Sequence, residues 1–130
     1  MVLDTSAIVA TIAKESDAAR FQNAMLGTTA LVISAVTALE IRIVLHSRHG
    51  EAAVEAFDEM LEQAGIVIEP FDAQMAQAAF DAFLRYGKGR GHPARLNIVD
   101  CAAYALAKAR GEPLLFKGSD FEKTDVQPAV

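Results

Sequence analysis

The sequence has no tryptophan, a single cysteine (Cys101) and an aromatic content of only 7%. One cysteine excludes an internal disulfide bond and a metal site built from several thiolates, and it is typical of a reducing compartment. No apolar run approaches the ~20 residues that span a membrane. The first residues lack the basic segment and long apolar core of a secretory signal peptide. We therefore expect a cytoplasmic protein without membrane association.

Positive charge is also scarce. The 130 residues carry 12 Lys and Arg against 17 Asp and Glu, which gives a net charge of −5. A protein that only coats nucleic acid is usually basic, whereas an acidic enzyme that holds cations can still bind phosphates. The hydrophobic fraction of 52% excludes a disordered chain. The length suits one domain over residues 1–130.

Short apolar runs alternate with longer helical stretches. Strands are predicted at Val2–Leu3, Leu31–Ile33, Ile66–Ile68 and Leu114–Phe116. Helices are predicted at Ser6–Ala13, Asp17–Leu26, Ala35–His49, Glu51–Ala64, Ala73–Tyr86 and Ile98–Arg110. Ser34, Asp72 and Asn97 precede three of these helices and are expected to cap them. The strand runs do not alternate with polar residues, as expected when helices cover both faces of a parallel sheet. We therefore expect an α/β fold with a site at the carboxyl ends of its strands.

Four acidic residues are expected near that edge of the sheet. Asp4 follows the first strand, and Glu40 lies on the helix after the second. Asp100 lies in the first turn of the last helix, and Asp120 follows the fourth strand. Each has a structural alternative. Asp4 can cap a helix, and Glu40 can reach water from the edge of an apolar face. Asp100 can close a capping box with Asn97, and Asp120 can be a turn residue.

Taken together, the acids indicate a metal site. Carboxylates that converge on one edge repel one another unless a divalent cation neutralises them. Oxygen ligands suit Mg²⁺ or Mn²⁺. Zinc is disfavoured, because His46 and His49 are three residues apart on a helix without a third ligand. Thr5 and Ser6, directly after the first acid, can orient bound water or begin the helix.

A local excess of positive charge follows the fifth predicted helix. No acid lies between Asp81 and Asp100. This segment carries Arg85, Lys88, Arg90, His92 and Arg95, together with three glycines, Gly87, Gly89 and Gly91. We expect it either to bind phosphates as a mobile loop or to be a solvated connector.

The chain resembles PIN-domain ribonucleases, and among them the VapC toxins of bacterial toxin–antitoxin pairs. The resemblance rests on VLDTSAIVA at the start, SAVTALEIRIVL with its Glu, and LNIVDCAAYALAKARGEPLLFKGSDF near the end. These segments occur in the expected order across nearly the whole chain. The resemblance implies a three-layer α/β domain with a Rossmann-like parallel sheet flanked by helices. It also implies a Mg²⁺- or Mn²⁺-dependent endoribonuclease that inhibits translation as a toxin.

The resemblance assigns roles to particular residues. The family's acidic quartet falls on Asp4, Glu40, Asp100 and Asp120. It implies that Asp4 and Asp100 bind the metal directly, and that Glu40 and Asp120 act through water or a second ion. The supporting polar positions are Thr5, Ser6 and Asn97. The turn after the last strand reads Lys-Gly-Ser-Asp where many relatives have a Thr-Gly-Asp type, so Asp120 is the weakest match. The candidate RNA phosphate contacts are Arg85, Lys88, Arg90, Arg95 and Lys117.

Partners are implied in the same way. The resemblance implies an RNA substrate of the tRNA or rRNA class, a VapB-like antitoxin whose tail covers the acidic site, and a homodimer. Apolar residues at Ile8, Val9 and Phe21–Leu26 are expected at the antitoxin groove or the dimer contact.

Two other functions stay open on the residues alone. A non-catalytic interaction module would bind a basic peptide through the acids. An aspartyl-phosphate enzyme would use Asp4 as its nucleophile, although Ser6 stands where a second acid is usual.

Overall fold

One parallel sheet of four short strands organises the chain, and the computed structural model describes all of residues 1–130. The strands are β1 (Val2–Leu3), β2 (Val32–Ser34), β3 (Val67–Glu69) and β4 (Leu114–Leu115). Their spatial order is β3-β2-β1-β4, and every neighbouring pair is parallel. The helices are α1 (Thr5–Ile12), α2 (Ala18–Leu26), α3 (Ala35–His49), α4 (Glu51–Gln63), α5 (Ala73–Tyr86), α6 (Ile98–Arg110) and the 3₁₀ turn η1 (Phe121–Lys123).

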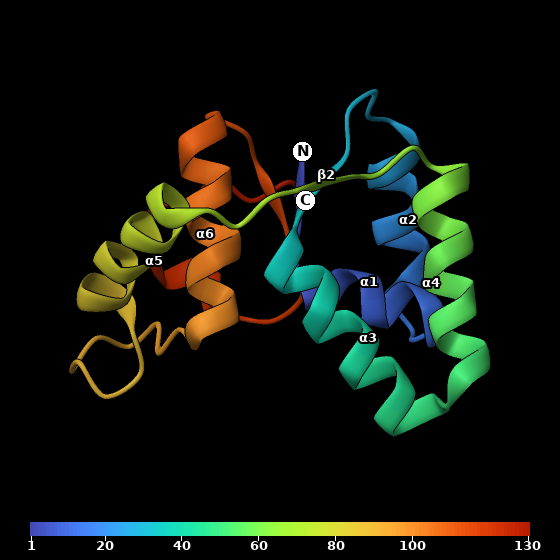
Figure 1. Cartoon of the computed structure of the whole chain (residues 1–130), viewed down its shortest axis with the longest axis horizontal. Helices are drawn as coiled ribbons and strands as arrows, with labels where there is room; N and C mark the ends of the chain where they lie inside the picture. Colours follow the sequence, from blue (N-terminus) through green and yellow to red (C-terminus); the bar gives the residue numbers. More distant parts are fainter.

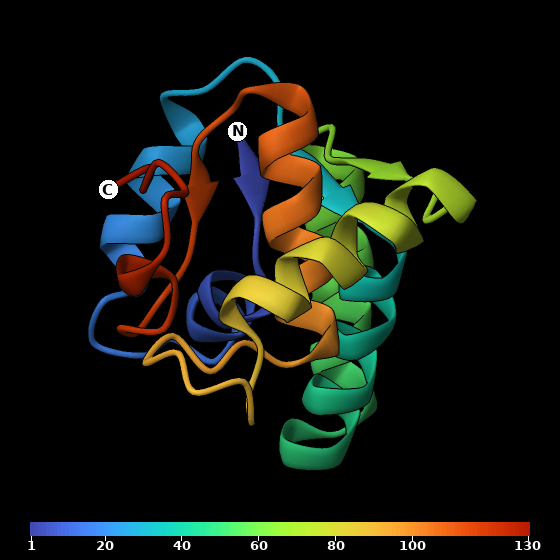
Figure 2. The same cartoon turned by 90° about the vertical axis from the view of Figure 1, so that its left-hand side faces the viewer.

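Successive residues of the central strands face opposite sides of the sheet. Val2 and Val32 pack on one side against α5 and α6. Leu3 and Ile33 pack on the other side against helices α1 to α4. Figures 1 and 2 show the resulting layers, with helices on both sides of the strands. The predicted three-layer α/β fold is confirmed, and none of its helices has the length and hydropathy needed to cross a bilayer.

The prediction that every strand is covered on both faces is wrong for β3. Val67 and Ile68 are 54% and 40% exposed. The strand lies at the edge of the sheet and pairs only with β2, so its outer side has no neighbouring strand. An uninterrupted apolar run therefore marks an exposed edge strand here.

The early helices also differ from expectation. Ile8 and Phe21, expected at a docking groove, are at most 1% exposed and belong to the core beneath the sheet. Leu26, at the end of α2, is 85% exposed. An apolar docking surface on α2 therefore has to include Leu26, because Phe21 on the same helix is already buried in the core.

Two of the three expected helix caps form hydrogen bonds. Asp72 accepts one from the Met75 N–H at 2.9 Å. Asn97 accepts one from the Asp100 N–H at 2.8 Å, within a capping box. Ser34 occupies the N-cap position of α3, but its hydroxyl forms no cap hydrogen bond and is buried without a partner.

The basic segment after α5 is closed at its base. The Lys88 N–H donates to the Leu96 carbonyl at 2.9 Å, and the Leu96 N–H donates to the Tyr86 carbonyl at 2.8 Å. The His92 ring packs edge-on against Tyr86 with centroids 4.8 Å apart. These contacts hold both ends of the basic loop (residues 87–96), and His92 in its middle, against the end of α5.

The last residues are fastened to the α5–α6 layer through one acid. Asp125 accepts hydrogen bonds from the Tyr104 and Tyr86 hydroxyls and from the Lys108 ammonium. The Tyr104 hydrogen bond, with the charges of Lys108 and Arg85, lowers the pKa of Asp125 to about 2 against its partial burial. Arg85 also lies 3.9 Å from this carboxylate. The cluster therefore links the chain end to both helices.

Two glycine substitutions test the packing at the base of the basic loop. A Cβ on Gly87 would lie 2.5 Å from the Phe83 carbonyl oxygen, whereas a Cβ on Gly27 meets nothing closer than 3.5 Å. We expect Gly87→Ala to lower the free energy of unfolding by about 1–3 kcal/mol, because the backbone must move. Gly27→Ala, the control, should be neutral or raise it by up to about 1 kcal/mol. Urea denaturation measures both, and equal effects would contradict the described loop base.

Candidate active site

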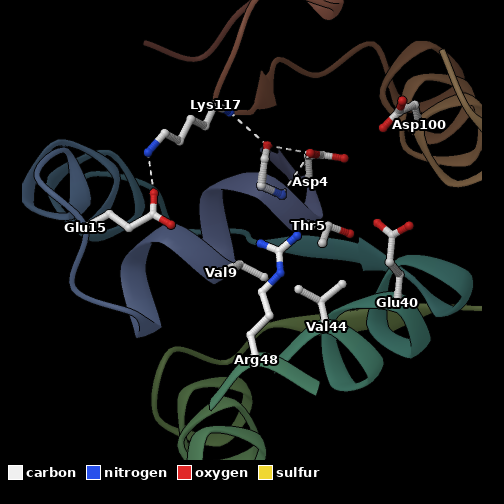
Figure 3. A pocket seen from close by; sticks show the side chains of 10 residues that line it. Asp4, Thr5, Val9, Glu15, Glu40, Val44, Arg48, Asp100 and Lys117 are labelled. Carbon is white, nitrogen blue, oxygen red and sulfur yellow. Dashed lines mark hydrogen bonds and ion pairs between the residues drawn. The ribbon is translucent and has the colours of Figure 1, made fainter. Parts of the chain in front are cut away.

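Three of the four predicted acids meet at one cavity. Asp4 leaves the end of β1, Glu40 lies on α3 and Asp100 lies in the first turn of α6. All three line a cavity of about 370 Å³ at the carboxyl end of β1 (Figure 3). Its other lining residues are Thr5, Ser6, Val9, Glu15, Val44, Arg48 and Lys117. The expected convergence of acids from separate elements therefore occurs for these three.

Asp4 is at once a helix cap and a cavity residue. Its side chain is almost fully buried, with the residue 3% exposed. One oxygen, Oδ2, accepts hydrogen bonds from the Ser6 N–H at 3.0 Å and the Ser6 hydroxyl at 2.6 Å. The other oxygen, Oδ1, is buried and has no hydrogen-bond partner. The two explanations offered for this residue are thus compatible, because the helix cap uses Oδ2 and leaves Oδ1 without a partner.

Burial dominates the electrostatics of Asp4. Loss of water raises the pKa of its carboxyl, the Ser6 hydrogen bonds oppose that rise, and the charge of Glu40 adds to it. A buried carboxylate oxygen without a partner is costly and rare in folded proteins. A cation bound at Oδ1 would remove that cost.

Asp100 combines the same two properties. Its Oδ2 accepts the Asn97 N–H at 2.9 Å and so completes the capping box. Burial raises the pKa of Asp100 to about 7, opposed by the Asn97 hydrogen bond and reinforced by the charges of Asp4, Glu40 and Asp120. The Asn97 N–H therefore orients this carboxylate, whereas a supporting role of Asn97 in the site stays a prediction.

Three buried hydroxyls near the ends of the first two strands also lack partners: Thr5, Ser34 and Thr37. Thr5 lines the cavity. Ser34 ends β2 in the register row of Asp4, because Val2 pairs with Val32. Groups of unsatisfied buried oxygens are uncommon, and bound water or an ion commonly explains them.

Asp120 is set apart from the other acids. It is exposed and does not line the acidic cavity. With Lys88 and Arg95 it lines a separate hollow of about 240 Å³. Its charge nevertheless contributes to the raised pKa of Asp100. Asp120 therefore faces the basic loop rather than the cavity, which matches its departure from the family's turn sequence.

The Lys117 side chain pairs with two acids in the turn between α1 and α2. Its ammonium forms ion pairs with Glu15 and with Asp17, the latter at 3.2 Å. Its backbone N–H donates to the Ser6 hydroxyl at 2.9 Å. The segment that follows β4 is thereby tied to the same hydroxyl that binds Asp4 (Figure 3).

Sequence reasoning did not assign Glu15 or Arg48 to the acidic cavity. Arg48 follows Glu40 by two helical repeats of four residues, with Val44 between them, and this spacing was available in the sequence. Glu15 lies in the turn after α1 and carried no comparable pattern.

The donor set fits a divalent cation of the magnesium type. It offers carboxylate and hydroxyl oxygens, one of them an orphaned buried atom, and no sulfur or imidazole nitrogen. No three His, Cys, Asp or Glu side chains lie close enough together to ligate a single ion directly. Water would therefore complete the coordination shell, as is common for Mg²⁺.

Comparison with known proteins identifies the family. The PIN domain model matches residues 1–127. This chain belongs to the PIN domain family. VapC ribonuclease Mb0625 of Mycobacterium bovis is 45% identical over 130 residues, which cover 100% of this PIN chain and 98% of that protein. Ribonuclease VapC of Mycolicibacterium smegmatis is 46% identical over 126 residues, 97% of each chain. The predicted family resemblance is confirmed.

Solved structures agree with the PIN fold. VapC20 of Mycobacterium tuberculosis superposes with a TM-score of 0.80 at 18% identity, over 96% of this chain and 95% of that one. FitAcB from Neisseria gonorrhoeae superposes with a TM-score of 0.63 at 20% identity, over 98% and 94%. At these identities the superpositions support the fold alone.

The raised pKa of Asp100 predicts how pH changes the stability of the metal-free protein. The folded chain keeps this carboxyl protonated up to about pH 7, whereas the unfolded chain releases the proton near the ordinary value of 3.8. Stability should therefore fall as pH rises through this window. In the presence of a chelator, we expect the urea midpoint to decrease from about pH 4 to about pH 7 and then to level off.

Asp100→Asn should lessen this decrease, because asparagine keeps an oxygen acceptor for the Asn97 N–H but carries no charge. Asp72→Asn, which alters an exposed helix cap, is the matched control. The same pH dependence in Asp100→Asn as in the parent would contradict the assigned burial and repulsion.

Proposed function

We propose that this chain is a metal-dependent endoribonuclease that hydrolyses RNA phosphodiester bonds as the toxin of a toxin–antitoxin pair. One observation carries the proposal. In a PIN chain that is 45% identical to a VapC ribonuclease over its full length, the Asp4 Oδ1 oxygen is buried without a partner beside Glu40 and Asp100. Such an arrangement suits cation binding and has no structural benefit of its own.

Asp4 and Asp100 would hold a Mg²⁺ or Mn²⁺ ion, with Glu40 and Asp120 acting through water or a second ion. When bound, the cation supplies charge neutralisation for phosphate oxygens and a more acidic water. Ser6 orients Asp4 through Oδ2, and Asn97 orients Asp100. Glu40 lines the same cavity from α3, and it would accept a proton from an attacking water.

The basic loop would hold the RNA backbone. Lys88, Arg90 and Arg95 form no ion pair within the chain and remain available to phosphates. Arg85 and Lys117 already contact acids, so an RNA phosphate would have to displace those contacts. Phosphate contacts position a strand without reading its bases, so the choice of RNA would depend on its shape and unpaired loops.

The proposed substrate is an RNA of the tRNA or rRNA class, whose cleavage would stop translation. VapC20, one of the PIN structures that this fold resembles, is described as a Sarcin-Ricin loop cleaving toxin. That description supports an RNA of the translation machinery as the class to test first.

A VapB-like antitoxin is the proposed inhibitor. A groove of about 590 Å³ runs between α1, α2 and α4 and is lined by Ile12, Met25, Leu26 and Met60 among others. This groove would take an apolar segment of the antitoxin around the exposed Leu26. An arginine of the antitoxin tail would suit the acidic cavity, because guanidinium groups pair well with clustered carboxylates.

A homodimer is proposed on a different face. Leu39 and Ile43 of α3 and Phe80 and Leu84 of α5 are exposed, and these helices lie on either side of α6 (Figure 1). Exposed apolar side chains on neighbouring helices suit a two-fold contact between copies of the chain. Light scattering should return twice the chain mass of 13.9 kDa, and Ile43→Glu should reduce it to that of a single chain. An unchanged mass in Ile43→Glu would show that this face does not form the dimer contact.

The nuclease proposal predicts a specific pattern of RNA cleavage. We expect the antitoxin-free protein to cut structured cellular RNA at discrete positions with Mg²⁺ or Mn²⁺ and not with a chelator. Asp4→Asn should reduce the rate about a hundredfold or more, the scale of losing one electrostatic catalytic group. It should stay folded, because it removes a buried charge.

Asp72→Asn is the matched control, since Asp72 also caps a helix but lies outside the cavity. Its cleavage rate should equal that of the parent. Absence of cleavage for every RNA class, together with absence of metal binding, would leave Asp4 as a helix cap and favour an interaction module.

A further inference from the structure

Arg48 is a cation inside the acidic cavity that has no acidic partner. It lies in the last turn of α3 and lines the cavity together with Asp4, Glu40 and Asp100. Figure 3 shows its guanidinium pointing into the hollow, beside Thr5 and Val9. No carboxylate lies within 4.0 Å of it. Its side chain therefore keeps all its hydrogen-bond donors free next to a proposed phosphate-cleaving centre.

Neighbouring cations behave differently. Lys117, on the same cavity, pairs with Glu15 and Asp17. Arg42, earlier on α3, pairs with Asp58 at 2.8 Å and lies over the Phe57 ring. An exposed arginine near several carboxylates commonly pairs with one of them. Arg48 does not, so the space between its guanidinium and the acids is available to a third group.

The position of Arg48 relative to the basic loop indicates a ligand for this unpaired guanidinium. Figures 1 and 2 show the basic loop and the carboxyl-terminal half of α3 at the same end of the molecule. In Figure 1 the first turn of α6, which carries Asp100, lies between them. Unpaired cations therefore line two separate hollows at this end of the molecule, Arg48 in the acidic cavity and Lys88 and Arg95 in the hollow of Asp120.

An RNA strand carries a phosphate at every nucleotide, and all of them need compensating charge near a group of carboxylates. We propose that Arg48 binds the RNA phosphate adjacent to the scissile one, on the side opposite the basic loop. The strand would then cross the acidic cavity between two cationic contacts. This inference rests on the proposed nuclease function and adds a substrate-positioning residue to it.

A structural role for Arg48 makes a different prediction. Basic residues in the last turn of a helix interact favourably with its dipole, and His46 and His49 occupy the same turn of α3. If Arg48 served only the helix, its removal would change stability and leave RNA affinity unaltered. Affinity and stability therefore have to be measured on the same variants.

The test uses RNA binding in the cleavage-deficient Asp4→Asn background, with a fluorescent oligouridylate as probe at constant Mg²⁺. A sequence-neutral probe is sufficient, because phosphate contacts are electrostatic and depend on salt. Adding Arg48→Gln should weaken binding about fivefold, the effect of one exposed charge-assisted contact. The slope of log affinity against log salt should become shallower by about 0.7, because the protein then neutralises one phosphate fewer.

Two further variants separate charge from geometry. Arg20→Gln, the matched control, removes an exposed arginine of α2 that has no ion pair and does not line the cavity, and it should leave affinity and slope unchanged. Arg48→Lys should keep the salt slope but recover only part of the affinity, because lysine lacks the planar fork. In the active protein, Arg48→Gln should act mainly on KM. Urea midpoints show that each variant is folded.

The outcomes distinguish this inference from the function on which it rests. If the parent cleaves and binds RNA while Arg48→Gln behaves like Arg20→Gln, Arg48 does not contact the substrate and the nuclease proposal stands. If the parent neither cleaves nor binds any RNA, the nuclease proposal fails and the role of Arg48 fails with it.

Discussion

The two carboxylate oxygens of Asp4 have different environments, and the site depends on this difference. Oδ2 accepts two hydrogen bonds from Ser6 and begins α1, which fixes the carboxylate at the end of β1. Oδ1 is left buried without a partner. A buried, unpaired carboxylate oxygen opposes folding unless the group is protonated or binds a cation. In the proposed function this oxygen is the position for the cation, and keeping it unpaired lowers the stability of the metal-free state.

The rest of the architecture supplies the neighbours of that oxygen. The parallel sheet brings the ends of β1 and β2 to one edge, and α3 and α6 project Glu40 and Asp100 toward it. A single hydroxyl links the elements, because Ser6 binds Asp4 and accepts the Lys117 N–H from the chain after β4. The capping box with Asn97 orients Asp100 in the same way. Helix capping and site construction thus use the same side chains.

Much of this was predictable from local patterns. Helices α3, α5 and α6 begin and end at the expected residues, because clear caps or glycine stops border them. The burial of β3 was predicted wrongly, since an apolar run does not tell a central strand from an edge strand. The separation of Asp120 from the cavity, and the pairing of Lys117 with Glu15 and Asp17, depend on how loops fold back in space. No spacing in the sequence encodes those contacts.

The proposed chemistry requires that Asp4 and Asp100 hold a divalent cation, and a Mn²⁺-soaked crystal measured at the manganese absorption edge is the sharpest test of that requirement. We expect an anomalous peak within bonding distance of the Asp4 Oδ1 oxygen and of the Asp100 carboxylate, absent from crystals of Asp4→Asn. A peak elsewhere on the chain, or no peak in a protein that cleaves RNA under the same conditions, would show that these two acids do not bind the ion.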